Sequence, residues 1–192
     1  LTGRSHPLMR RSLLSNFPGT VYRCLNDGQW TPIFLSGDVE AISGYTAQEF
    51  LTKTAPSFPS LVHADDLASV EGAVTSAAAQ RTPFEIEYRI THRDGTVRWV
   101  QERGRGIYGA DGRFVHLDGC MFDITERKQA EAALAAALDN VRASERQFRS
   151  LTASIPGAVY RCKLDGNWTS VFMSEAMAEI SGYTVAELSE IG

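Results

Sequence analysis

The chain has 192 residues, a formal net charge of −4 and 43 % hydrophobic residues, which is the composition of an ordinary globular protein. The mildly acidic balance argues against a nucleic-acid partner, which needs a strongly basic face, and no apolar run approaches the roughly 20 residues of a membrane helix. We therefore expect a protein segment with no nucleic-acid contact and no direct membrane contact. Its cysteines, Cys24, Cys120 and Cys162, form no CxxC pair or zinc-type cluster, and free thiols favour a reducing, cytoplasmic compartment.

A hairpin is the first folded element that the sequence predicts. After residues 1–16, which we expect to form an N-terminal helix or linker, residues 21–25 are rich in strand formers. Asp27-Gly28 supplies a turn, and residues 30–35 make a second strand.

Next comes the end of one helix and the start of another, in the phrase ISGYTAQEF. Gly44 can take the positive φ that closes a short helix over residues 39–43. Thr46 and Glu49 have the spacing of a capping box, in which each side chain bonds the other residue's backbone N–H. These residues have a structural explanation and match no catalytic constellation.

A loop and a longer helix occupy the middle of the domain. Residues 53–61 contain two prolines and small polar residues, so they are predicted to be loop. Asp65 and Asp66 then open a helix, where carboxylates suit the positive end of the helix dipole. Its apolar residues recur at helical spacing, namely Leu67, Val70, Val74 and Ala77.

Three strands follow, over residues 84–91, 96–108 and 113–123, with Asp-Gly turns between them. The first alternates cleanly between apolar and polar residues, as a half-buried strand does. Two early and three late strands around a helical middle predict an α+β fold with a five-stranded antiparallel sheet.

A long helix is predicted over residues 124–150, starting just after Asp123. Leu134, Val141 and Phe148 recur every seven residues, the period of a left-handed coiled coil. A single solvated helix lying on its own domain is the alternative. We favour a homodimer with these three residues in its seam, because an isolated apolar stripe needs a partner.

The sequence contains an internal repeat. Residues 11–50 and 149–188 align without a gap at an offset of 138 residues, which carries Gly44 onto Gly182 and Cys24 onto Cys162. This period is too long for a solenoid and matches one domain plus a linker. We therefore predict a domain over residues 17–123, a signalling helix over 124–150, and the truncated start of a second such domain over 151–192.

Six phrases in order, PGTVYRC, ISGYTAQEF, HADD, FEIEYRI, RDGTVRWV and DITERK, give the chain a family resemblance. They resemble a PAS domain with its C-terminal PAC part, of the kind found in bacterial histidine kinases and diguanylate cyclases. The resemblance implies a five-stranded antiparallel sheet with helices on one face, enclosing a cavity. It also implies a signal-transfer role for Asp123, Ile124 and Thr125, where the last strand runs into a helix. Where the family often shows His-Pro-Asp-Asp, this chain has Ala64 in place of the proline.

The interior could hold a ligand or could simply be packed. The candidate wall of a cavity comprises Tyr22, Phe34, Ile42, Val70, Val74, Tyr88 and Met121. We favour the packed reading for such apolar residues, because close-packed cores leave few voids. The identity of any cofactor stays unknown, although the chain lacks both the reactive-cysteine phrase of photoactive flavin domains and a histidine on the central helix for haem.

His116, Asp118 and Cys120 share one face of a predicted strand because side chains alternate. Such a trio could bind a metal, but three positions on one strand rarely converge without ligands from elsewhere. We favour a polar row or a cavity wall and predict no metal site.

The expected function is that of a cytosolic sensor and dimerisation module of a bacterial signal-transduction protein. It would relay a ligand- or partner-induced change through its C-terminal helix to a downstream histidine kinase or diguanylate cyclase. A ligand-free interaction or spacer module with no sensing role is the alternative. We expect no enzyme activity in this chain, because it has no acid/base pair, nucleophile–base arrangement or phosphate loop.

Overall fold

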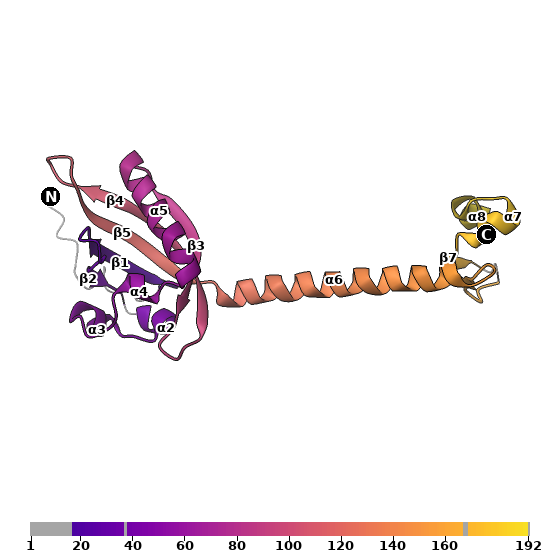
Figure 1. The fold of residues 1–192 in the computed structure, drawn as a ribbon, viewed down its shortest axis with the longest axis horizontal. Coiled ribbons are helices and arrows are strands. Elements are labelled where there is room, and N and C mark those ends of the chain that lie inside the picture. The colour runs from indigo at the N-terminus through magenta and orange to yellow at the C-terminus, as the bar shows by residue number, and fades with distance from the viewer. Residues whose placement is uncertain (1–16, 37, 167–168, 192) are drawn as a thin grey trace, which may run out of the picture. The chain divides into compact units, whose positions relative to one another are not determined.

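The structure is a computed structural model that describes residues 17–36, 38–166 and 169–191 (Figure 1). The helix or linker expected over residues 1–16 lies outside the described residues. The chain divides into two compact units, the first ending at Gln129 and the second beginning at Ala130.

In its described residues, the first unit contains five strands and four helices before the long helix. In chain order these are β1 (Thr20–Leu25), β2 (Pro32–Leu35), α2 (Val39–Ser43), α3 (Ala47–Leu51), α4 (Phe58–Leu61), α5 (Ala64–Gln80), β3 (Phe84–Thr91), β4 (Val97–Tyr108) and β5 (Phe114–Asp123).

The five strands form one antiparallel sheet in the order β2-β1-β5-β4-β3. The first and last strands of the unit thus lie side by side at the centre of the sheet. The predicted α+β fold with a five-stranded antiparallel sheet is confirmed. The starts of β1, β4 and β5 differ from the prediction by one residue. The start of β2 differs by two: β2 begins at Pro32 and not at residue 30, because Trp30 has a φ of 49°, which is incompatible with an extended strand.

Side chains that alternate along each strand separate an inner face of the sheet from an outer face. The inner face packs under the helices, and α5 lies along β3 and β4 (Figure 1). The buried core comprises Tyr22, Cys24, Ile42, Val62, Val74, Ala77, Phe84, Tyr88, Ile90, Val100, Leu117 and Met121. Burial of this apolar face supplies the main driving force for packing the helices against the sheet.

The helix signals of ISGYTAQEF form as predicted. Gly44 has a φ of 77°, and its N–H bonds the Glu40 carbonyl to close α2. The Thr46 hydroxyl accepts from the Glu49 backbone N–H at 3.2 Å, and the Glu49 carboxylate accepts from the Thr46 N–H at 2.8 Å. Gly44 is needed for a second reason, because a Cβ there would lie 2.6 Å from the Cβ of Arg93.

One local prediction is corrected. The stretch 53–61 is not all loop, since it contains the one-turn helix α4, whose proline is at a first-turn position that needs no N–H donor. Its neighbour α5 starts where predicted, and His63 Nδ1 accepts from the Asp65 N–H at 3.4 Å.

The long helix α6 (Thr125–Ser154) has 30 residues and extends four residues beyond the predicted end. The second unit continues with β6 (Tyr160–Cys162), β7 (Ser170–Met173), α7 (Ala176–Ser181) and α8 (Val185–Ile191). Its hairpin repeats the pairing of the first: Tyr160 pairs Met173 as Tyr22 pairs Leu35. The repeated sequence therefore has repeated local structure, while its membership of a truncated second domain stays a prediction.

Candidate functional site

A buried carboxylate lies on the inner face of the sheet. Glu102 is on β4, at the same inward-pointing parity as Val100, and is only 6 % exposed. Tyr88 on the neighbouring strand β3 donates its hydroxyl to Glu102 Oε2 at 2.6 Å, and Tyr22 on β1 donates to Glu102 Oε1. Three strands thus bring one acid and two phenols to a single point inside the fold.

Burial of this cluster shifts the pKa values of its ionisable groups. Burial raises the pKa of Glu102, and the hydrogen bonds from Tyr22 and Tyr88 oppose that rise. Burial and then the charge of Glu102 raise the pKa of both tyrosines well above its ordinary value. The nearby Cys24 thiol has a pKa raised to about 12 by burial and by Glu102, so it stays protonated and unreactive.

A cavity of about 60 Å³ lies between this cluster and the helices. It is far smaller than the roughly 300–1,000 Å³ pockets of drug-sized ligands. Its walls are Tyr22, Cys24, Trp30, Pro32, Leu35, Phe50, Phe58, Pro59, Val62, Leu67, Val70, Glu71, Val74, Tyr88, Glu102, Leu117 and Met121.

The structure brings together five of the seven residues expected to line a cavity. These are Tyr22, Val70, Val74, Tyr88 and Met121. Ile42 is buried in the adjoining core and does not line the cavity. Phe34 was placed wrongly, because it points away from the interior, pairs with Arg23 on the outer face and is 42 % exposed.

Glu102 and Trp30 were missed as lining residues. Side chains alternate along a strand, so positions 100 and 102 lie on the same face as each other. This alternation could have predicted that Glu102 points inward with Val100. Trp30 belongs to a turn with positive φ, and no sequence pattern predicts where such a side chain points.

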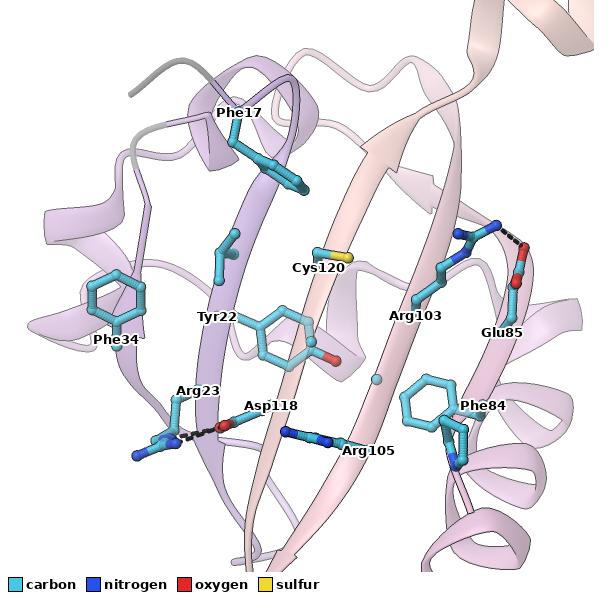
Figure 2. A pocket seen from close by; sticks show the side chains of 14 residues that line it. Phe17, Tyr22, Arg23, Phe34, Phe84, Glu85, Arg103, Arg105, Asp118 and Cys120 are labelled. Atoms are coloured by element: carbon cyan, nitrogen blue, oxygen red, sulfur yellow. Dashed lines mark hydrogen bonds and ion pairs between the residues drawn. The ribbon is translucent and has the colours of Figure 1, made fainter. Parts of the chain in front are cut away.

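The outer face of the sheet carries a broad hollow of about 1,020 Å³ (Figure 2). Arg23 binds both oxygens of Asp118 at 2.6 Å, and Arg103 binds Glu85 at 2.8 Å. The hollow is lined by Phe17, Val21, Tyr22, Arg23, Phe34, Pro83, Phe84, Glu85, Arg103, Gly104, Arg105, Asp118, Gly119 and Cys120. The outer face therefore combines aromatic rings with paired charges.

The polar trio on β5 lies on this outer face. Arg23 holds the pKa of Asp118 below its usual range, and burial raises the pKa of Cys120, which disfavours the thiolate that a metal requires. Among the residues that the structure describes, no group of three or more His, Cys, Asp and Glu side chains is arranged to hold a metal ion.

His92 lies in the turn between β3 and β4, where its backbone N–H bonds the Thr96 carbonyl. Its side chain is largely covered, however, because the ring packs beside Gly44 and its Nδ1 lies 2.9 Å from the Asp94 carboxylate.

At the base of α6 the three predicted signal-transfer residues are fixed to the sheet. The Asp123 carboxylate accepts from the Thr125 N–H at 2.8 Å, and the Thr125 hydroxyl accepts from the Trp99 N–H at 2.9 Å. Ile124 between them is buried.

Ion pairs reinforce the same junction from β3. Glu87 binds Lys128 at 2.6 Å and Arg127 at 2.7 Å, and these cations hold the pKa of Glu87 below its usual range. Lys128 also lies over the Trp99 ring, 5.2 Å from its centroid. The first turn of α6 is thus tied to β3 and β4.

The predicted seam residues of α6 lie on an exposed stripe. Leu134 is 63 % and Val141 is 65 % exposed, and Leu138, which the prediction omitted, shares their face at i+4 and i−3. Phe148 is also exposed and stacks edge-on against Phe172 of the second unit's hairpin.

No helix in the described part of the chain has the length and apolar content needed to cross a membrane. The three cysteines are all free thiols.

Comparison with known proteins gives concordant matches. Residues 32–121 match the family model of the PAS fold. The blue-light-activated histidine kinase of Brucella anthropi is 27 % identical over 163 residues, which are 81 % of this chain and 32 % of that protein. Sensor protein FixL of Bradyrhizobium diazoefficiens is 30 % identical over 135 residues, which are 70 % of this chain and 25 % of that protein. The chain spans a third or less of the length of these two relatives.

A crystal structure of a sensory box histidine kinase/response regulator from Burkholderia thailandensis E264 has a similar fold. It superposes with a TM-score of 0.56 at 27 % identity and covers 69 % of this chain and 97 % of that chain.

Proposed function

Because residues 32–121 match the family model of the PAS fold, we propose that this chain is a sensor and dimerisation module of a bacterial signal-transduction protein. A histidine kinase is the effector that the similar proteins favour. The effector activity, in this proposal, belongs to another part of the parent protein.

One observation carries the proposal: the last strand of the sheet runs into α6 with only the buried Ile124 between them. Met121 lines the interior cavity and lies two residues before Asp123, which bonds the first turn of the helix. A change at the cavity therefore has a short covalent route to α6. Signal transfer would be a two-state shift, in which one arrangement of β5 favours one rotation or register of the helix.

Dimerisation would use the apolar stripe of α6. Leu134, Leu138 and Val141 stay exposed in the single chain, and a helix with such a stripe gains stability by pairing it with another copy. The outer face of the sheet is a second surface that a homodimer could use, since Phe17 and Phe34 lie exposed or half-buried beside its hollow.

Sedimentation velocity of the full chain tests the dimer. Leu134→Lys/Val141→Lys introduces four charges per dimer into the stripe, so at concentrations on the order of tens of micromolar we expect the wild type to be dimeric and this variant monomeric. Ala136→Lys/Ala143→Lys adds the same charge to the opposite face of α6 and should leave the dimer intact.

A monomeric wild type would remove the coiled-coil part of the proposal. Equal dissociation of both double variants would show that added charge alone, and not loss of the stripe, separates the chains.

The alternative is a ligand-free interaction or spacer module, and the small interior of about 60 Å³ favours it. Native mass spectrometry and an absorbance spectrum of the purified protein distinguish the two. A bound small molecule supports sensing, and a clean unliganded mass leaves the spacer reading standing.

We further propose that the protein works in the cytoplasm, which its three free thiols support. We also propose that residues 151–192 begin a second domain of the same kind. The matching hairpin register and the positive φ of Gly182, 78° against 77° at Gly44, support this reading.

A further inference from the structure

The walls of the interior cavity have an unbalanced chemistry. Two carboxylates line it, the buried Glu102 and the exposed Glu71, and among its described lining residues none is Arg, Lys or His. Five aromatic side chains share the lining: Tyr22, Trp30, Phe50, Phe58 and Tyr88. The cavity therefore combines acidic groups and electron-rich rings with no cation of its own.

A buried carboxylate in this setting lacks a counter-ion. The groups that face Glu102 are the hydroxyls of Tyr22 and Tyr88 and the thiol of Cys24, all of which are neutral. Hydrogen bonds offset part of the desolvation of a buried charge, but a paired cation offsets far more. A carboxylate oxygen has two lone pairs, so each Glu102 oxygen can accept a second donor besides its tyrosine.

The aromatic rings that line the cavity also suit a cation. The negative faces of aromatic rings attract organic cations within about 6 Å, and aromatic cages with an acid are how proteins recognise alkylammonium groups. The volume of about 60 Å³ corresponds to about two water molecules, so only an ion of a few heavy atoms fits.

We propose that the interior cavity binds a small alkylammonium ion of about methylammonium size, with Glu102 as its counter-ion and the aromatic rings as its cage. This inference rests on the proposed sensor function and names the class of ligand that the sensor takes. The exposed carboxylate of Glu71 on α5 adds negative potential at the outer edge of the cavity, which raises the local concentration of cations.

The binding test uses the full chain and methylammonium chloride, with sodium chloride at equal ionic strength as the control. Affinity per heavy atom has a ceiling, so for a ligand of so few heavy atoms we expect a Kd on the order of 10 mM. The readouts are saturable amide shifts in ¹H–¹⁵N spectra at residues lining the cavity and a rise in Tm. Methylammonium should act saturably, whereas tetramethylammonium should not act because it is too large.

Glu102→Gln keeps the shape and the hydrogen-bonding oxygen of the side chain and removes its charge. We expect it to weaken methylammonium binding at least tenfold. Glu40→Gln removes an exposed carboxylate away from the cavity lining and should bind as the wild type does. If Glu102→Gln fails to fold, the ¹³C signal of the Glu102 carboxyl in the wild type supplies the answer, since a cation bound beside it should shift that signal saturably.

Several results would overturn the inference: no saturable shift in the wild type, unchanged binding by Glu102→Gln, an unmoved Glu102 carboxyl signal, or equal binding of neutral methanol. These outcomes are separate from the sedimentation result. If the chain is dimeric but does not bind methylammonium, the proposed dimerisation module stands and the proposed ligand class fails. If the chain is monomeric but binds methylammonium, the ligand class stands and the dimer fails.

Discussion

Single side chains with several partners hold the helices of this domain to its sheet. Asp66, in the first turn of α5, accepts from the backbone N–H of Arg89 at 2.8 Å and from its guanidinium at 2.6 and 2.9 Å. These bonds hold the pKa of Asp66 at about 2, against an ordinary value of 3.8. Asp65 is its sequence neighbour, yet it is mostly exposed and lies 3.5 Å from the same arginine.

A pH dependence of stability follows for Asp66. Because its folded pKa lies below its unfolded value, its contribution is complete above about pH 5 and is lost as the pH falls toward 2. Asp66→Asn should therefore lower the free energy of unfolding by about 1–2 kcal/mol at pH 6, allowing for solvent screening, and by much less near pH 2.5. Urea unfolding at the two pH values measures this difference.

Asp65→Asn is the matched control and should change stability by less than about 0.5 kcal/mol at either pH. An Asp66→Asn deficit of the same size at both pH values would mean that the Arg89 ion pair does not account for it.

At the scale of elements, the junction of β5 with α6 is the part of the fold most closely tied to the proposed relay. Thr125 starts the helix and at the same time accepts a hydrogen bond from β4 at Trp99. The sheet and the helix therefore share a partly buried hydrogen bond, which couples a shift of one to the other.

Thr125→Val tests this shared bond. Valine keeps the shape of threonine and leaves the Trp99 N–H without its partner, which should lower the free energy of unfolding by about 1–3 kcal/mol. Hydrogen exchange should show the Trp99 amide losing protection by at least about tenfold, while the amides of β1 stay protected.

Thr91→Val serves as the control, because Thr91 is an exposed residue of β3 where valine is equally suited to a strand. Unchanged protection at Trp99 in Thr125→Val would show that the threonine hydroxyl does not hold the strand to the helix.

At the scale of the whole chain, the repeat places identical phrases in different surroundings. Ile42 and Ile180 both precede Ser-Gly-Tyr-Thr, but Ile42 is 3 % exposed and Ile180 is 68 % exposed. The first copy packs against a five-stranded sheet, whereas the described part of the second unit has a two-stranded one.

Matched substitutions in the two copies should therefore differ in effect. Ile42→Ala removes buried methylenes and should destabilise the first unit by about 2–4 kcal/mol. Ile180→Ala removes exposed ones and should leave the unfolding of the first unit within about 0.5 kcal/mol of the wild type. Hydrogen exchange of the central strands β1 and β5 reports the stability of the first unit in both variants, and equal losses would contradict the difference in burial.

Much of the fold could be predicted because its signals are local. Strand alternation, Asp-Gly turns, the capping box at Thr46 and the closing glycine at Gly44 each depend on a few neighbouring residues, and all of them form as expected. The candidate site was predicted in part: the apolar wall follows from parity along strands and helices. Phe34 was misplaced because the turn at Trp30, which precedes β2, is not encoded locally. Parity could place Glu102 on the inner face, but its meeting with Tyr22 and Tyr88 depends on the pairing of strands distant in sequence.

By itself the sequence determined the elements, the repeat at an offset of 138 residues and the family resemblance, because periodicity and capping act within a few residues of the chain. Only the tertiary structure decided that Tyr22, Tyr88 and Glu102 meet at one small cavity. That meeting depends on the register between β1, β5, β4 and β3, which is set by packing over the whole sheet, and a one-residue slip would turn Glu102 to the outer face.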